Sequence, residues 1–184
     1  TRCSRDWSSD VCSSDLLEFA MLQMAAEAFL SRSSEFPLNA IPGNAQLREN
    51  LLEGNLHASR FIESQATEFL SDYAVLSQFR NDPLKVGDSG FSGTLFRNRS
   101  TNELILSFRS TEFIEDAIRD SEATNKLEVK ELGWAFGQIV DMESWYDSLR
   151  NDPNLLGGNS FYVTGYSLGG HLAAAFNILR REAS

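Results

Sequence analysis

One serine in this sequence lies where a nucleophile would be expected. The segment 165–170 reads Gly-Tyr-Ser-Leu-Gly-Gly, so glycines lie two positions before and two positions after Ser167. This spacing is typical of a nucleophile elbow, whose glycines let a sharp strand-to-helix turn close without clashes between Cβ atoms. Ser167 is therefore the candidate nucleophile, and the backbone N–H of Leu168 is a candidate donor to a developing oxyanion. The alternative interpretation is an ordinary glycine-rich turn with a solvated serine.

The flanking elements are those that such a turn needs. An apolar run, Phe161–Thr164, precedes the glycines, and an apolar helical pattern begins at Leu172. Together they predict a strand, a sharp turn and a helix. Upstream, an apolar stripe at helical spacing ends at Asp152-Pro153, and its aromatic residues Trp145 and Tyr146 are interpreted as packing residues. A helix between two strands predicts a β-α-β crossover and therefore a parallel sheet.

The centre of the chain predicts a strand followed by a hairpin. Tyr73–Phe79 has the composition of a strand, and Phe91–Phe96 alternates between apolar and small or polar residues. A polar turn at Asn98–Glu103 leads into Leu104–Phe108, a nearly unbroken apolar run. Such a run is typical of a strand that is buried on both faces. The sequence therefore predicts an α/β fold in which this last strand is buried on both faces.

The first part of the chain predicts helices. Residues 17–30 combine good helix formers with a broad apolar face. Asn44 is a candidate N-cap for a second helical region that extends to Phe69, with Gly54 as the expected break.

The first sixteen residues differ in character from the rest. Residues 6–16 resemble one reading frame of a common sequencing-adapter oligonucleotide, and a disordered N-terminal tail is the alternative. The stretch lacks the apolar core of a signal peptide. It also contains both cysteines, Cys3 and Cys12, so the remainder offers neither a disulfide framework nor a thiolate metal site. Residues 1–16 are therefore set apart, and residues 17–184 are interpreted as one partial domain.

Composition excludes several classes of function. The chain has 184 residues and a net charge of −10. It contains no basic stripe that would neutralise phosphates, which argues against a nucleic-acid partner. It also contains no apolar run long enough to be a transmembrane segment. Neither a cofactor nor a metal ion is expected.

Two segments carry a family resemblance. Leu104–Thr111 and Val163–Gly170 together resemble the class 3 (fungal-type) lipase family of α/β-hydrolases, especially bacterial members at the head of large secreted proteins. The resemblance spans the chain from about Leu17 to its end. It implies an α/β-hydrolase fold, ester hydrolysis with a lipid or other ester as substrate, and secretion from a bacterium.

The resemblance also implies roles for residues after the central strand. Thr111 matches the hydroxy residue that supplies the second oxyanion donor, and Arg109 matches the arginine of the family motif. Ser110 replaces the family's glycine between them. Asp120 lies at the spacing of an aspartate that holds the oxyanion residue, and residues 113–118 match a lid helix at the lipid–water interface. In the elbow itself, Tyr166 replaces the usual histidine, at a position expected to pack.

The expected base and acid of a catalytic triad are missing from the sequence. A serine needs a histidine base oriented by a carboxylate, and in α/β-hydrolases both follow the serine in the chain. The residues after Ser167 contain no Asp. His171 follows too closely in the same helix, and His57 precedes the sheet, so both are interpreted as structural. The sequence is therefore interpreted as the N-terminal half of an α/β-hydrolase domain, inactive as given, without the triad Asp, the triad His and the later strands.

The function predicted from the sequence is carboxylic ester hydrolysis of the lipase or phospholipase type. One alternative is another serine hydrolase on the same fold, such as a thioesterase. The other is a non-catalytic binding module that has kept the fold and lost the chemistry. Fold analogy alone does not decide between them.

Overall fold

The computed structural model describes residues 13–31, 41–55, 59–79, 89–110 and 136–182. The helices are α1 (Ser13–Glu27), α2 (Asn44–Glu53), α3 (Glu63–Asp72), α5 (Phe136–Asn151) and α6 (Leu168–Glu182). The strands are β1 (Tyr73–Phe79), β2 (Gly93–Asn98), β3 (Leu104–Phe108) and β4 (Phe161–Gly165). Among these described residues, no helix is long and apolar enough to cross a membrane.

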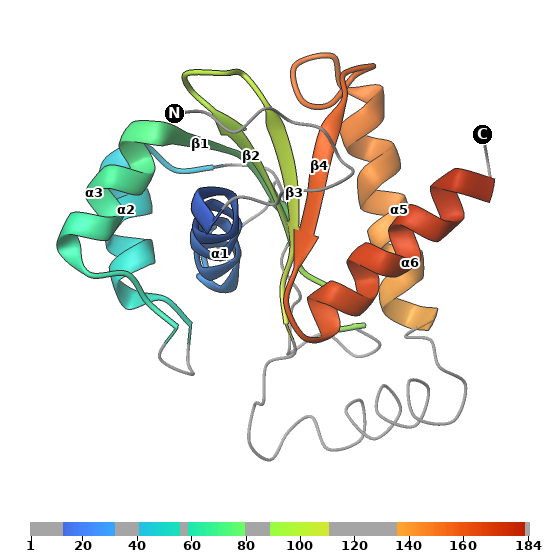
Figure 1. Ribbon diagram of the computed structural model, residues 1–184, viewed down its shortest axis with the longest axis horizontal. Helices are drawn as coiled ribbons and strands as arrows, with labels where there is room; N and C mark the ends of the chain where they lie inside the picture. The colour runs from blue at the N-terminus through green and yellow to red at the C-terminus, as the bar shows by residue number, and fades with distance from the viewer. Residues whose placement is uncertain (1–12, 32–40, 56–58, 80–88, 111–135, 183–184) are drawn as a thin grey trace.

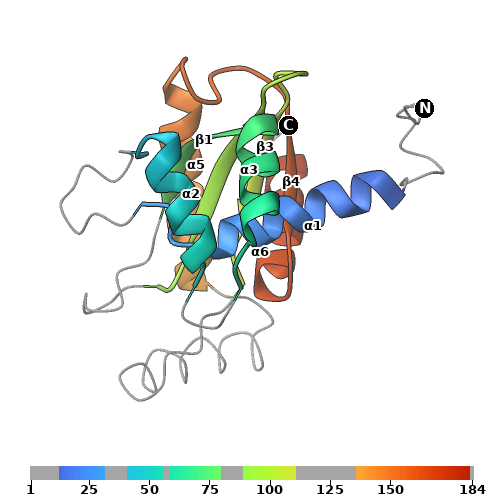
Figure 2. The same cartoon turned by 90° about the vertical axis from the view of Figure 1, so that its left-hand side faces the viewer.

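The strands form one mixed sheet in the order β1-β2-β3-β4. β1 pairs with β2, and β2 with β3, in antiparallel fashion, whereas β3 and β4 run parallel. Figure 1 shows α1, α2 and α3 on one face of the sheet and α5 and α6 on the other. Figure 2 shows α1 crossing the strands with α2 and α3 beside it. The predicted hairpin and β-α-β crossover are thus confirmed within a three-layer α/β/α arrangement. The sheet is mixed and not parallel throughout, because the hairpin makes β2 antiparallel to both of its neighbours.

Each face of the sheet has its own hydrophobic core. Phe96 and Ile105 point toward α1, α2 and α3, whereas Leu95 and Leu106 point toward α5 and α6. Every residue of β3 is buried, as its apolar sequence predicts for a strand covered on both sides. On the second face, Trp145 and Tyr146 are buried packing residues of α5, again as predicted.

Three helix boundaries differ from the sequence prediction. The first helix begins at Ser13 and ends at Glu27, so it starts before and stops short of the predicted range 17–30. It stops because Gln78 binds the chain just beyond it. The amide of Gln78 accepts the Leu30 N–H at 2.9 Å and donates to the Ala28 carbonyl at 3.0 Å. In α2, Gly43 occupies the N-cap position expected for Asn44, while the break at Gly54 is confirmed.

Tyr73 provides a test of the packing between α1 and the sheet. Its hydroxyl donates a hydrogen bond to the Glu18 carboxylate of α1. The pKa of the Tyr73 phenol is raised above its ordinary value. Burial is the larger cause, and this hydrogen bond is the second. In the unfolded chain the phenol loses its proton near pH 10, whereas the folded protein retains it. We therefore expect the free energy of unfolding to fall as pH rises above about 10.

Tyr73→Phe isolates this contribution, because other groups also titrate at alkaline pH. Urea unfolding between pH 8 and pH 11.5 should show a shallower alkaline loss of stability in Tyr73→Phe than in the wild type. Equal slopes in the two proteins would contradict the contribution of Tyr73.

Candidate active site

Ser167 lies on a strained turn between β4 and α6. β4 ends at Gly165, α6 begins at Leu168, and Ser167 between them is exposed. Its φ angle is +54°, in the left-handed region that a residue with a Cβ atom rarely adopts. Strain of this kind persists where the surrounding structure enforces it, and it clusters at functional sites. The predicted strand-turn-helix at Ser167 is therefore present, and its serine has a strained, left-handed backbone.

The two glycines of the motif allow close contacts that no other residue would permit. A Cβ atom on Gly165 would lie 2.1 Å from the carbonyl oxygen of Gly169. A Cβ atom on Gly169 would lie 2.1 Å from the carbonyl oxygen of Phe108, at the end of β3. The first of these contacts closes the turn on itself, and the second presses the start of α6 against β3. Both glycines are thus required by the geometry around Ser167.

The start of α6 presents backbone donors next to the serine. The first intrahelical bond there runs from the His171 N–H to the Ser167 carbonyl at 3.2 Å. The preceding N–H groups, beginning with Leu168, belong to the helix turn that has no intrahelical acceptors. Together with the helix dipole, they favour negative charge at this end of α6. The Leu168 N–H, the candidate oxyanion donor, lies in this environment.

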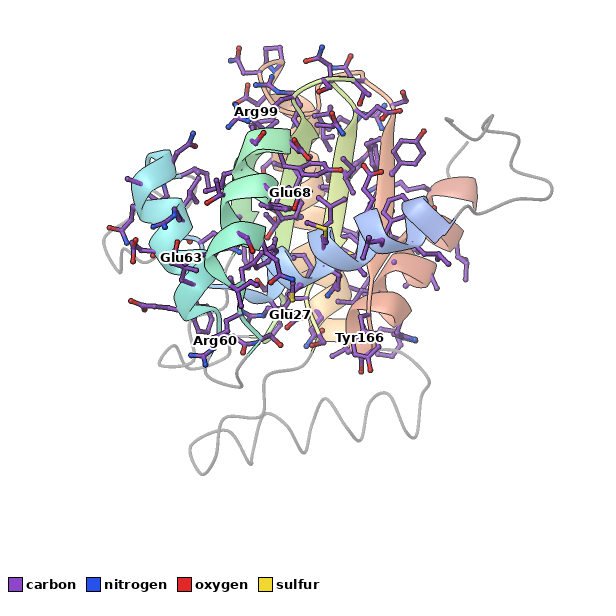
Figure 3. All side chains as sticks on the ribbon, turned by 60° about the vertical axis from the view of Figure 1, so that its left-hand side comes forward. Glu27, Arg60, Glu63, Glu68, Arg99 and Tyr166 are labelled. Atoms are coloured by element: carbon purple, nitrogen blue, oxygen red, sulfur yellow. The ribbon has the colours of Figure 1, made fainter. Side chains whose placement is uncertain are left out.

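The structure shows the environments of His171 and Tyr166, two residues near the turn. The Nε2 atom of His171 is buried, which agrees with its interpretation as a structural residue. His57 lies outside the described residues. Tyr166 does not pack as predicted, because its side chain is 70 % exposed. Its position directly before the sharp turn directs it toward solvent, at the lower end of the molecule in Figure 3.

The ends of β3 and β4 lie next to each other. Their parallel register places Phe108 opposite Gly165, so the residues that follow each strand leave the sheet at the same edge. Arg109 is buried there, with its N–H bonded to the Ser92 carbonyl at 3.0 Å and its guanidinium over the Phe29 ring. Thr111, Asp120 and residues 113–118, which the family resemblance assigned to the oxyanion hole and the lid, lie outside the described residues.

A buried carboxylate that the sequence analysis missed contacts this edge. The Ser110 N–H donates to Oε1 of Glu27 at 2.9 Å, and Nε2 of Gln23 donates to the same oxygen at 2.8 Å. The Ser107 hydroxyl in turn donates to Oε1 of Gln23 at 2.8 Å. Glu27 is 7 % exposed. The available signal was an acidic residue flanked by Ala25, Ala26 and Ala28, within an otherwise apolar stretch.

The chain matches no protein-family model, no curated protein and no solved structure in the comparisons. Only the sequence and the structure therefore bear on the function of this chain. Among the residues that the structure describes, no group of His, Cys, Asp and Glu is arranged to hold a metal ion.

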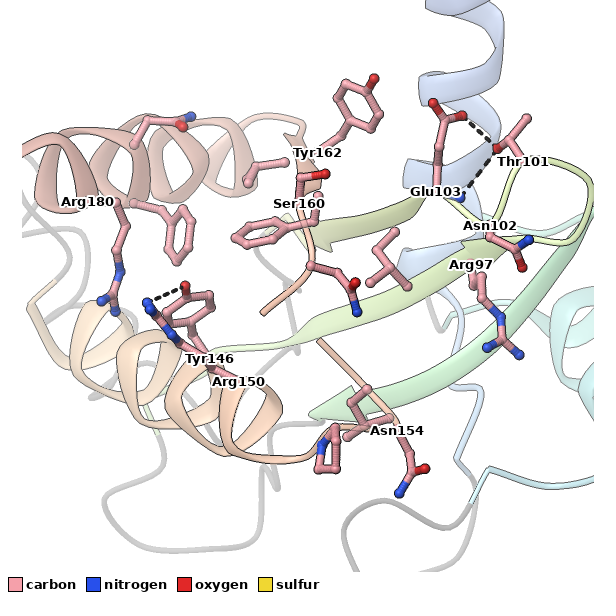
Figure 4. A pocket seen from close by; sticks show the side chains of 18 residues that line it. Arg97, Thr101, Asn102, Glu103, Tyr146, Arg150, Asn154, Ser160, Tyr162 and Arg180 are labelled. Atoms are coloured by element: carbon pink, nitrogen blue, oxygen red, sulfur yellow. Dashed lines mark hydrogen bonds between the residues drawn. The ribbon is translucent and has the colours of Figure 1, made fainter. Parts of the chain in front are cut away.

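A cavity of about 1330 Å³ lies at the opposite end of the sheet from Ser167. It is lined by the first residues of β3 and β4 and by Tyr146, Arg150 and Arg180 of the helices (Figure 4). Ser167 lies two residues beyond the last residue of β4 and is not among the lining residues. This cavity is therefore separate from the candidate nucleophile.

Proposed function

We propose that this chain carries the nucleophile of a serine ester hydrolase with an α/β-hydrolase fold, acting on lipid esters. The single observation that carries the proposal is the exposed Ser167 at φ +54°, held between β4 and α6 by close glycine contacts. A solvated serine in an ordinary turn does not require a left-handed backbone, whereas a nucleophile elbow does. The choice of lipid esters rests on the resemblance of the two motifs to class 3 lipases.

The chemistry follows from the arrangement around Ser167. Oγ of Ser167 would attack the ester carbonyl, forming a C–O bond while its proton passes to a histidine base. The Leu168 N–H would donate to the oxyanion of the tetrahedral intermediate. Collapse of the intermediate would break the ester C–O bond and release the alcohol, which takes up the proton. Water would then attack the acyl-serine carbonyl while the histidine takes its proton. Collapse of this second tetrahedral intermediate would release the carboxylic acid and return the proton to Oγ of Ser167. In the family that the motifs resemble, the histidine base and its carboxylate partner follow the serine in the chain.

A covalent probe tests this assignment directly. The protein expressed from its complete gene is incubated with an alkyl fluorophosphonate, which reacts with serines that a base activates. We expect one adduct, mapped to Ser167 by peptide mass spectrometry, and we expect Ser167→Ala to abolish it. Heat-denatured protein is the control, because denaturation removes the activation but leaves the serine.

Labelling at another serine, or equal labelling of native and denatured protein, would contradict the proposal. A series of nitrophenyl esters of increasing chain length then tests the substrate class. A rate that rises with chain length and with substrate aggregation supports a lipase-like enzyme, whereas a preference for acyl thioesters would favour the thioesterase alternative.

A further inference from the structure

Glu27 occupies a position that stability alone does not favour. It is the last residue of α1, where the helix dipole is negative and opposes a carboxylate. It is also buried, and burial disfavours a charged group unless donors surround it. The donors are the Ser110 N–H and Nε2 of Gln23. A buried acid in this unfavourable place is held by a contact to the backbone just after β3.

That contact acts on the backbone beside the nucleophile turn. Ser110 lies two residues beyond Phe108, and Ser167 lies two residues beyond Gly165, the partner of Phe108 in the parallel register. Gly169, in the first turn of α6, also packs closely against the carbonyl of Phe108. One backbone segment, 108–110, is therefore fixed by α6 from one side and by Glu27 from the other.

The other connections of Glu27 make this contact rigid. Gln23 lies one helical turn before Glu27 and links it to the Ser107 hydroxyl within β3. Gln23, Glu27 and Ser107 are all buried, so water does not compete for these hydrogen bonds. These hydrogen bonds thereby fix the position of the Ser110 N–H relative to β3 and α1. Figure 3 shows Glu27 at the same lower end of the molecule as Tyr166, the residue before Ser167.

We infer that Glu27 is a positioning residue of the proposed site: its carboxylate fixes the Ser110 backbone beside the turn that carries Ser167. The inference rests on the proposed ester hydrolase function. Glu27 does not touch the reacting atoms. It fixes the backbone at the end of β3, against which Gly169 packs the first turn of α6 that carries the Leu168 N–H.

Three substitutions separate geometry from charge in the protein expressed from its complete gene. Glu27→Leu removes the acceptor at similar volume, and a displacement of the backbone by about 1 Å is expected to lower kcat by about 10- to 100-fold, with KM changed by less than about two-fold. Glu27→Asp keeps the charge but withdraws the acceptor from Ser110, so it should also lower kcat. Glu27→Gln keeps an amide oxygen at the same place, so it should restore kcat to within about three-fold of the wild type.

Leu51→Ala is the matched control for stability. Leu51 is fully buried in α2, within the core of the same sheet face, and no hydrogen bond described above involves its side chain. It should lower Tm through a cavity while leaving kcat unchanged below the unfolding transition. If Glu27→Leu does not fold, Glu27→Asp and Glu27→Gln decide the question by themselves.

The outcomes distinguish this inference from the proposed function. Wild-type kcat in Glu27→Asp, or equal loss of kcat in Glu27→Gln and Glu27→Asp, would overturn the positioning role while ester turnover that depends on Ser167 remains. Ester turnover that persists in Ser167→Ala would overturn both proposals together.

Discussion

Ser167→Ala is expected to lower kcat for ester hydrolysis by about 10⁶-fold, because removal of a serine nucleophile leaves only the catalysis contributed by binding and the oxyanion donors. The residual rate should still exceed that of the uncatalysed reaction, since the Leu168 N–H and the start of α6 are retained. The measurement is the steady-state hydrolysis of a nitrophenyl ester by the protein expressed from its complete gene. A decrease of less than ten-fold would rule out Ser167 as the nucleophile.

Ser167→Gly provides a control that connects the chemistry to the strained backbone. It abolishes the hydroxyl as alanine does, but it also removes the Cβ atom that is unfavourable at φ +54°. The relief of strain outweighs the greater chain entropy of glycine, so the glycine variant should be more stable than the alanine variant by about 0.5–1 kcal/mol. Equal urea midpoints for the two variants would contradict backbone strain at Ser167.

The parts of the fold that the sequence predicted well are those set by local patterns. β1 has the predicted limits, and β3 is buried along its whole length, as its apolar run indicates. The break at Gly54 was also predicted, and the reason is visible in the structure. Its φ is +68°, and a Cβ atom there would lie 1.9 Å from the Ser59 carbonyl oxygen.

The parts that the sequence did not predict depend on contacts between distant residues. α1 stops before the end of its helical pattern because Gln78, about fifty residues later, binds the chain at Ala28 and Leu30. Helix propensity cannot anticipate such a contact. Likewise, the environment of Glu27 depends on β3, which packs against α1 and brings the Ser110 N–H to its carboxylate.

The candidate site likewise has a part that local sequence predicts and a part that depends on contacts between distant residues. The serine and its glycines lie within six residues, so a sequence pattern was sufficient to predict the turn between β4 and α6. The juxtaposition of that turn with the end of β3 needed the parallel register, in which Phe108 faces Gly165. The expected oxyanion residue Thr111 remains a prediction from the family resemblance.

Gly169→Ala is expected to destabilise the fold by about 3 kcal/mol, in the opposite direction to helix propensity. Gly169 is the second residue of α6, and replacing a helical glycine with alanine ordinarily stabilises by about 1 kcal/mol. Here the added Cβ atom would lie 2.1 Å from the Phe108 carbonyl oxygen. Backbone cannot move aside as a flexible side chain does, so α6 must shift away from β3. Urea unfolding monitored by circular dichroism gives the change in free energy.

Gly170→Ala is the matched control, since it lies in the same helix turn with a less severe contact. Its Cβ atom would lie 3.3 Å from the Gly165 carbonyl oxygen, so the gain in helix propensity should offset most of the crowding. The two alanine variants differ by one position and share the same change in composition. A large loss of stability only in Gly169→Ala would therefore place the cost in the contact between α6 and the end of β3. Equal effects of the two substitutions would instead indicate that the glycines affect the stability of the helix itself, and not its packing against the end of β3 beside Ser167.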